Sequence, residues 1–126
     1  MPEECCGLLF GRADGSMRSI VRIHATTNIA AGDRHRRYEI DPQVVFDAIR
    51  GANVSGEQLL GFFHSHPDGS LTPSSHDVKT AWPDKSYLIV GVDSSRIVGH
   101  RSWRVDPNGT GMQEETITLT DSRLLH

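Results

Sequence analysis

The most informative stretch of this 126-residue chain is residues 63–77, which read FHSHPDGSLTPSSHD. His64 and His66 stand two residues apart on an expected strand, so strand alternation places both imidazoles on one face. The chain then turns, and Asp77 falls in the first turn of an expected helix, where a carboxylate is favoured electrostatically. Two histidines, one carboxylate and an open fourth position form the ligand set of a catalytic zinc site. Such a metal would lower the pKa of a bound water toward about 7.

Each fragment of this pattern has a simpler interpretation when it is taken alone. A His-x-His pair is frequently just two surface side chains, and Ser74-x-x-Asp77 resembles a capping box, which is purely structural. Capping does not explain two histidines on one strand face followed by a tight loop and an acid. The joint pattern therefore favours a metal site. We expect His76, next to Asp77, to point elsewhere and to lie at the surface.

A metal-activated water needs a general base, and four glutamates are candidates: Glu3, Glu4, Glu39 and Glu57. Glu4 directly precedes the first apolar strand. It could reach the site if that strand pairs beside the strand at 58–65, and it would then act first as base and later as acid to the leaving amine. The alternative is that Glu3 and Glu4 are polar residues at a frayed terminus. Spacing alone does not decide between the two.

The rest of the chain predicts a sheet with two helices packed on it. Apolar or alternating runs predict strands at 6–11, 17–24, 37–40, 58–65, 87–92, 97–105 and 116–119. Asp41-Pro42 marks a helix start, and Gly51 with Asn53 marks its end. Pro73-Ser74 opens a second helix that stops near Trp82-Pro83. The result is one α/β or α+β domain over residues 1–126, with a mixed or antiparallel sheet.

Composition excludes several functional classes. Thirteen Lys and Arg against sixteen Asp and Glu give a net charge of −3, so nucleic-acid binding has no support. No apolar stretch approaches the roughly 18 residues of a membrane span. The start, Met-Pro-Glu-Glu, is not that of a signal peptide. Cys5 and Cys6 are adjacent, so a disulfide between them would be strained. We therefore expect a cytoplasmic protein with no nucleic-acid or membrane partner.

The combined pattern resembles that of the JAMM metalloproteases, also called the MPN-plus or JAB family. The family motif is an upstream glutamate, then His-Ser/Thr-His, seven residues, Ser, two residues and Asp. The chain matches it at Glu4, His64, His66, Ser74 and Asp77, with residues 67–73 as the seven. The resemblance extends over nearly the whole chain. Residues 38–42 and 82–90 are similar to the small bacterial branch of the family.

The resemblance implies a role for each matched residue. His64, His66 and Asp77 would ligate zinc, as metal ligands. Glu4 would be the general base and proton shuttle, and Ser74 would stabilise the developing oxyanion. Family members hydrolyse peptide or isopeptide bonds at the C-terminus of ubiquitin or ubiquitin-like proteins, and the small bacterial ones trim ubiquitin-like sulfur carriers. The implied fold is a cytidine-deaminase-like α/β sandwich, a mixed β-sheet flanked by helices.

The chain departs from the family pattern in two ways. It starts almost at Glu4, so we expect it to lack the strand and helix that usually come first. It also shows no sign of the insertions that larger deubiquitinases use, which favours a compact prokaryotic activity. Cys6 is interpreted as a buried core residue.

Two other functions remain open. One is a non-catalytic MPN-type scaffold or binding module, although degenerate members of that kind usually lack the metal ligands. The other is a non-haem iron oxygenase, which also uses two histidines and one carboxylate. That function would leave Ser74 and Glu4 unexplained. Measuring which metal the protein contains distinguishes an iron oxygenase from a zinc hydrolase.

Overall fold

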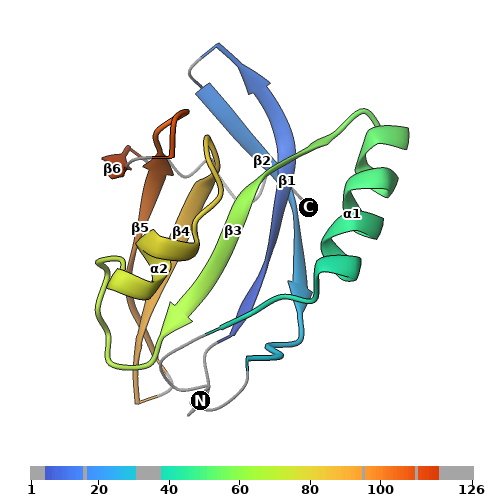
Figure 1. Ribbon diagram of the computed structural model, residues 1–126. Helices are drawn as coiled ribbons and strands as arrows, with labels where there is room; N and C mark the ends of the chain where they lie inside the picture. Colours follow the sequence, from blue (N-terminus) through green and yellow to red (C-terminus); the bar gives the residue numbers. More distant parts are fainter. Residues whose placement is uncertain (1–4, 16, 31–37, 95, 110, 117–126) are drawn as a thin grey trace, which may run out of the picture.

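The computed structural model describes residues 5–15, 17–30, 38–94, 96–109 and 111–116 (Figure 1). These residues form a six-stranded sheet and two helices. The strands are β1 (Cys6–Asp14), β2 (Met17–Thr26), β3 (Gln58–His66), β4 (Ser86–Asp93), β5 (Arg96–Val105) and β6 (Met112–Glu115). Their order in the sheet is β2-β1-β3-β4-β5-β6. Neighbours are antiparallel except β3 and β4, which are parallel, so the predicted mixed sheet is confirmed.

The central strand β3 lies between β1 and β4 and is hydrogen-bonded to both. Cys6 of β1 is the antiparallel partner of His64, and Ile89 of β4 is its parallel partner. The parallel pair requires a crossover, which contains helix α2 (Ser75–Thr80). At the other edge, β1 and β2 form an antiparallel hairpin, and Gly15 supplies the positive φ of 63° that its turn needs.

Helix α1 (Pro42–Val54) begins where the sequence predicts it. Asp41 is the N-cap, and its carboxylate accepts a hydrogen bond from the backbone N–H of Gln43 at 2.9 Å. The predicted end at Gly51 and Asn53 is wrong, because the helix continues to Val54. Ala52 is completely buried in the core, and this burial holds the last turn in place against the modest helix penalty of the glycine.

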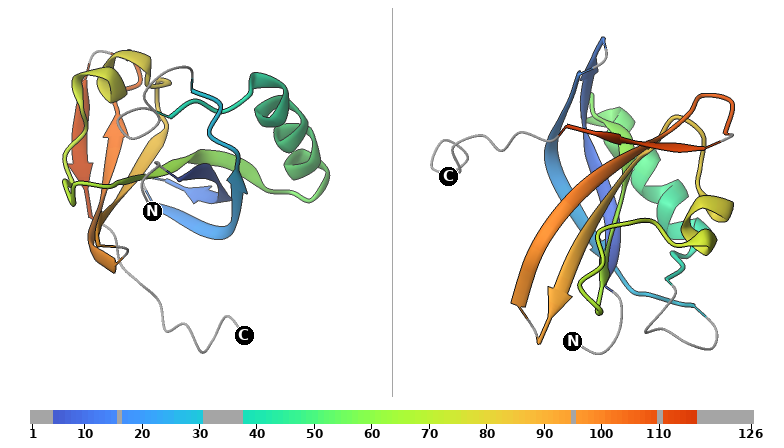
Figure 2. Two further views of the ribbon diagram at one scale, coloured as in Figure 1. Left: turned by 90° about the horizontal axis from the view of Figure 1, so that it is seen from below. Right: turned by 90° about the vertical axis from the view of Figure 1, so that its left-hand side faces the viewer.

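The apolar core lies between the sheet and α1. It consists of Leu8, Phe10, Val45, Ala52, Leu59, Phe62, Tyr87 and Val105. Figure 2 shows α1 and α2 on the same side of the strongly curved sheet. The ring of Phe62 stacks on that of Tyr87 with centroids 5.3 Å apart. Burying each such large side chain contributes about 1.5–3 kcal/mol to stability. Neither helix of the described residues is long and apolar enough to cross a membrane.

One predicted strand is wrong, and another lies almost entirely outside the described residues. The last described strand is β6, Met112–Glu115; Thr116 follows it, and the rest of the predicted 116–119 strand lies outside the described residues. The sequence did not predict β6 because polar contacts hold it, and no apolar pattern signals these. The Ser102 hydroxyl donates to the Glu115 carboxylate at 2.6 Å, and the Arg104 guanidinium pairs with that carboxylate at 3.0 Å. The strand predicted at 37–40 is the wrong one: residues 38–40 form no strand, and residue 37 is outside the described part.

Candidate metal centre

Strand β3 and helix α2 bring three potential metal ligands together. His64 and His66 lie on the same face of β3, and their Nε2 atoms are 3.0 Å apart. The Oδ2 atom of Asp77, from α2, is 3.3 Å from each of these nitrogens. All three residues are buried, with His64 completely inaccessible. Within the described part of the chain, these residues form a group suited to holding a metal ion.

The loop between β3 and α2 returns the chain to the histidines. The N–H of Gly69 donates to the carbonyl of His66 at 3.1 Å, and the carboxylate of Asp68 accepts from the N–H of Ser70 at 2.9 Å. Gly69 has a φ of 80°, which favours glycine. A side chain at Gly91 of β4 would lie 2.6 Å from the carbonyl oxygen of Gly69, so that glycine permits the close approach of the loop.

Ser74 and Asp77 form the capping box that the sequence also suggested. The Ser74 hydroxyl accepts from the N–H of Asp77 at 3.0 Å, and the N–H of Ser74 donates to Oδ2 of Asp77 at 2.8 Å. The same Oδ2 atom faces both histidines. Capping and ligand placement are therefore one arrangement here, because the cap fixes the side chain of Asp77 in the direction of β3.

The two histidines are held in different ways. Nδ1 of His66 lies 3.1 Å from the carbonyl oxygen of Ser70, so it carries the proton and donates it, which leaves Nε2 as an unprotonated ligand. Nδ1 of His64 is buried without a hydrogen-bond partner among the described residues. The ring of His64 instead stacks on Tyr38, with centroids 4.3 Å apart and planes at 21°. Sequence reasoning missed Tyr38 as a part of the site; its one signal was an aromatic residue shortly before the Asp41 helix cap.

Burial and hydrogen bonding favour the protonation states that metal binding requires. Burial lowers the pKa of His64, and this outweighs the opposing effect of Asp77. For Asp77, burial alone would raise the pKa. A proton on Nε2 of His64, which a metal would displace, donates to this carboxylate, and so does the N–H of Ser74. Both hold that pKa well below its usual range. A neutral imidazole and an ionised carboxylate are the forms that coordinate a metal.

The spacing of the three ligand atoms fits a small divalent cation. Bonds of about 2.0–2.2 Å at tetrahedral angles would place neighbouring ligand atoms about 3.3–3.6 Å apart. The observed separations are 3.0 Å between the two nitrogens and 3.3 Å from each nitrogen to the carboxylate oxygen. Two imidazole nitrogens and one carboxylate oxygen suit zinc and other first-row divalent metals.

Two of the four candidate bases, Glu39 and Glu57, lie within the described residues. Glu3 and Glu4 lie outside the described residues. Glu57 precedes β3 at its far end, about 30 Å of extended chain from His66 at about 3.3 Å per residue. It pairs with Arg22. Glu39 is exposed, and its backbone binds residues 28–29.

The pairing that Glu4 would need is present. Strand β1 lies beside β3, and just before it the N–H of Cys5 donates to the Ser65 hydroxyl at 2.8 Å. The N–H of Ser65 in turn donates to the carbonyl of Cys5 at 2.9 Å. Cys6 is buried, as expected, and its sulfur contacts Thr26. His76 is partly exposed and does not belong to the ligand group.

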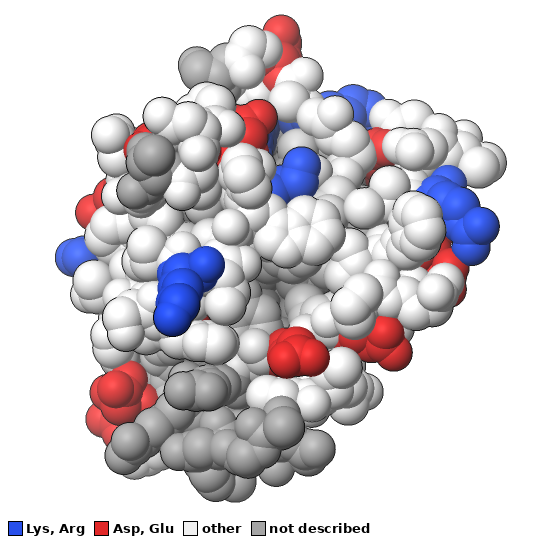
Figure 3. All heavy atoms as spheres, in the orientation of Figure 1, with Lys and Arg blue, Asp and Glu red and all other residues white. Residues whose placement is uncertain are grey.

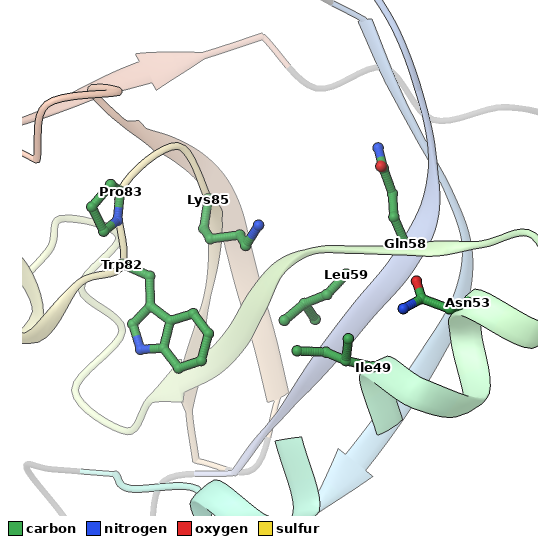
Figure 4. Close-up of a pocket in the computed structure, with 7 residues that line it drawn as sticks. All are labelled: Ile49, Asn53, Gln58, Leu59, Trp82, Pro83 and Lys85. Atoms are coloured by element: carbon green, nitrogen blue, oxygen red, sulfur yellow. The ribbon is translucent and has the colours of Figure 1, made fainter. Parts of the chain in front are cut away.

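The remaining surface features lie away from the three ligands. On the face shown in Figure 3, basic and acidic residues of the described part are interspersed rather than gathered into one patch. An open pocket is found at the opposite end of β3 (Figure 4), and it is lined by Ile49, Asn53, Gln58, Leu59, Trp82, Pro83 and Lys85. Its walls come from α1, the start of β3 and the segment between α2 and β4. None of the three ligands contributes to it.

Comparison with known proteins identifies similar chains. The family model described as prokaryotic homologs of the JAB domain matches residues 1–106. The chain is 36% identical to the desampylase of Haloferax volcanii over 106 residues, which are 83% of this chain and 73% of that protein. It is 33% identical over 95 residues to the probable TtuB-protein conjugate cleaving protease of Thermus thermophilus, covering 75% of this chain and 60% of that protein.

A solved structure has the same fold. The solution structure of protein DSY2949 from Desulfitobacterium hafniense superimposes with a TM-score of 0.80 at 32% identity. The match covers 100% of this chain and 86% of that one. The match therefore extends over the sheet, both helices and the loop that joins β3 to α2.

Proposed function

Because the chain belongs to the family of prokaryotic homologs of the JAB domain, we propose that it is a JAMM-type zinc metalloprotease that cleaves conjugates of a ubiquitin-like protein. The observation that carries this proposal is the convergence of His64, His66 and Asp77 at the end of β3. One relative is named a desampylase, and another is named as a protease that cleaves TtuB-protein conjugates. The substrate would be a peptide or isopeptide bond at the C-terminus of a ubiquitin-like or sulfur-carrier protein.

His64, His66 and Asp77 would hold the zinc ion, which when bound supplies a Lewis-acidic centre and a water of lowered pKa. Other contacts within the protein orient these ligands. The Ser70 carbonyl selects the tautomer of His66, and the cap at Ser74 directs the carboxylate of Asp77. Such outer contacts orient ligands and strengthen metal binding.

Glu4 is assigned as the general base that takes a proton from the attacking water and delivers it to the leaving amine. Support comes from the residue next to it. Cys5 is bonded through both its N–H and its carbonyl to Ser65, which stands between the two histidines in sequence. Cys5 is therefore fixed beside the part of β3 that carries the ligands, and Glu4 directly precedes it in the sequence.

Ser74 is assigned to stabilise the oxyanion that forms on the scissile carbonyl. Its hydroxyl accepts a hydrogen bond from the N–H of Asp77. A hydroxyl that accepts one bond still has its own hydrogen to donate. Because Ser74 is the cap of α2, it is close to the carboxylate ligand and its position is fixed.

The proposal extends to the domain organisation, the cellular location and the class of partner. Residues 1–126 would act as one JAMM domain. Cys5 and Cys6 are both thiols, which suits a reducing, cytoplasmic location. The net charge of −3 and the mixed surface charge suit a protein partner better than a nucleic acid.

The test is cleavage of a defined conjugate. Zinc-loaded protein is incubated with a ubiquitin-like carrier whose C-terminal glycine is joined to a lysine of a second protein, and the products are identified by mass spectrometry. We expect an intact carrier with a free C-terminal carboxylate and a free lysine. Chelation should abolish cleavage, and added zinc should restore it. A folded, zinc-loaded protein that binds carriers but leaves every conjugate intact would instead support the scaffold function.

A further inference from the structure

The surroundings of the two histidines differ in one important respect. His66 is oriented by the bond from its Nδ1–H to the carbonyl of Ser70 at 3.1 Å. His64 is completely buried, yet its Nδ1 has no hydrogen-bond partner in the described part of the chain. Histidine ligands are ordinarily oriented by a hydrogen bond at the second ring nitrogen. Something other than a hydrogen bond must therefore direct Nε2 of His64 toward the other two ligands.

Packing around His64 supplies the alternative. Its strand neighbours are Cys6 and Ile89, both buried aliphatic or thiol side chains without a flat surface. His66 meets it edge-on, with planes at 60°. Tyr38 lies against the face of the imidazole, with centroids 4.3 Å apart and planes at 21°. A near-parallel ring at this distance opposes rotation of the imidazole about its Cβ–Cγ bond, because turning would drive its edge into the neighbouring ring.

Glu39, the residue that follows Tyr38, is held by contacts that do not involve the ligands. The N–H of Glu39 donates to the side chain of Asn28 at 3.0 Å, and the carbonyl of Glu39 accepts from Ile29 at 2.9 Å. The same Asn28 oxygen accepts from Ala30, and Asn28 is buried. The backbone beside Tyr38 is thus anchored to the segment that follows β2. None of these anchoring contacts involves His64, His66 or Asp77.

We infer that Tyr38 is a positioning residue that holds His64 as a metal ligand by stacking on its ring. The inference rests on the proposed zinc site and assigns no chemistry to Tyr38 itself. The aromatic face is the essential feature. Phenylalanine should therefore replace tyrosine, whereas a small or aliphatic side chain should not.

Zinc affinity is the decisive measurement, made by competition with a chromophoric chelator on Tyr38→Ala, Tyr38→Leu and Tyr38→Phe. We expect about tenfold weaker binding for the alanine and leucine variants, in the range for residues that orient ligands, and about wild-type affinity for phenylalanine. The absorption spectrum of the cobalt(II) form should change in the first two variants and not in the third. Trp82→Ala is the matched control, since that ring packs edge-on against Phe62 rather than on a ligand.

Thermal unfolding of the metal-free variants shows whether each is folded. If Tyr38→Ala does not fold, Tyr38→Leu still tests the inference, because leucine retains an apolar side chain of some size. Unchanged zinc affinity and cobalt spectrum in Tyr38→Leu would overturn the inference and leave the zinc hydrolase proposal standing. Equal losses in the phenylalanine and alanine variants would also overturn it, because stacking would then not be the cause. A wild-type protein that binds no zinc would overturn the proposed function, and this inference with it.

Discussion

The two ends of β3 are equally well buried but have opposite chemistry. At the start of the strand, Leu59 and Phe62 are at most 7% exposed and pack among apolar side chains. At its end, His64 and His66 are at most 9% exposed, and they face a buried carboxylate instead. One strand therefore carries the apolar core and the polar cluster on a continuous face, within a few residues of each other.

The difference shows what each end is for. Burying a large apolar side chain contributes about 1.5–3 kcal/mol, so the first end stabilises the fold. Burying imidazoles and a carboxylate is unfavourable unless they are fully paired, and a nitrogen of His64 has no partner among the described residues. A cluster that does little for stability, yet converges on one point, indicates selection for chemistry. The predictions below test this division.

The largest effect is expected from Asp77→Asn. The amide can still cap α2, but it lacks the charge that a metal ligand supplies, so zinc should be lost and hydrolysis should fall by at least about a thousandfold. Zinc per chain is measured by elemental analysis, alongside the cleavage rate. Asp47→Asn, an exposed carboxylate on α1, is the control and should retain both. Full zinc content in Asp77→Asn would remove this residue from the ligand set.

Glu4→Gln should separate metal binding from catalysis. Zinc content should remain at the wild-type level, while kcat falls by about 10²–10⁴-fold because the amide cannot accept a proton. Glu3→Gln is the matched control, one residue away along the chain, and should cleave normally. If Glu4→Gln cleaves as fast as the wild type, another group is the base.

Phe62→Ala probes the opposite end of β3. Phe62 is 5% exposed and stacks on Tyr87, so its truncation should reduce the free energy of unfolding by about 3–5 kcal/mol. Urea unfolding of the metal-free protein measures this change. Phe46→Ala, whose ring is 63% exposed on α1, should change stability by less than about 1 kcal/mol. The folded fraction of Phe62→Ala should still bind one zinc per chain, since the ligands are unchanged. Loss of zinc would show that metal binding at the end of β3 depends on packing at its start.

Local rules explain which parts of the molecule could be predicted. Strand alternation put His64 and His66 on one face, and helix-start chemistry put Asp77 in a first turn. Both rules depend on residues a few positions apart, so they need no knowledge of the fold. The same holds for the start of α1, where Asp41 is followed by a proline.

The parts that could not be predicted depend on contacts between distant segments. Strand β6 is polar in sequence and is held by Ser102 and Arg104 from the neighbouring strand. Tyr38 contacts His64, which lies 26 residues later in the sequence, and no periodic pattern connects the two. The last turn of α1 persists past Gly51 because Ala52 is buried by the sheet. In each case a tertiary contact outweighed the local signal.

The smallest expected effect is a pH dependence of the metal-free protein that comes from His64. Burial lowers its pKa below the ordinary value of 6.5, so the unfolded chain binds more protons than the folded one as the pH falls through that value. Stability should therefore be greatest above about pH 6.5 and should decline below it. The slope for one proton is at most about 1.4 kcal/mol per pH unit. Asp77, whose pKa is depressed, contributes only below about pH 4, where its carboxyl begins to protonate in the unfolded chain.

Comparison with His64→Leu isolates this contribution, because the other histidines titrate in both proteins. Urea unfolding is followed between pH 5 and 7 in the presence of a chelator. The wild type should lose more stability than the variant over this range, so their curves should diverge toward low pH. Phe62→Ala should lower the whole curve without changing its slope, since its neighbour Tyr87, whose pKa burial raises to about 12, does not titrate between pH 5 and 7. Parallel curves for the wild type and His64→Leu would show that burying this imidazole carries no penalty, and the contrast between the two ends of the strand would then not be energetic.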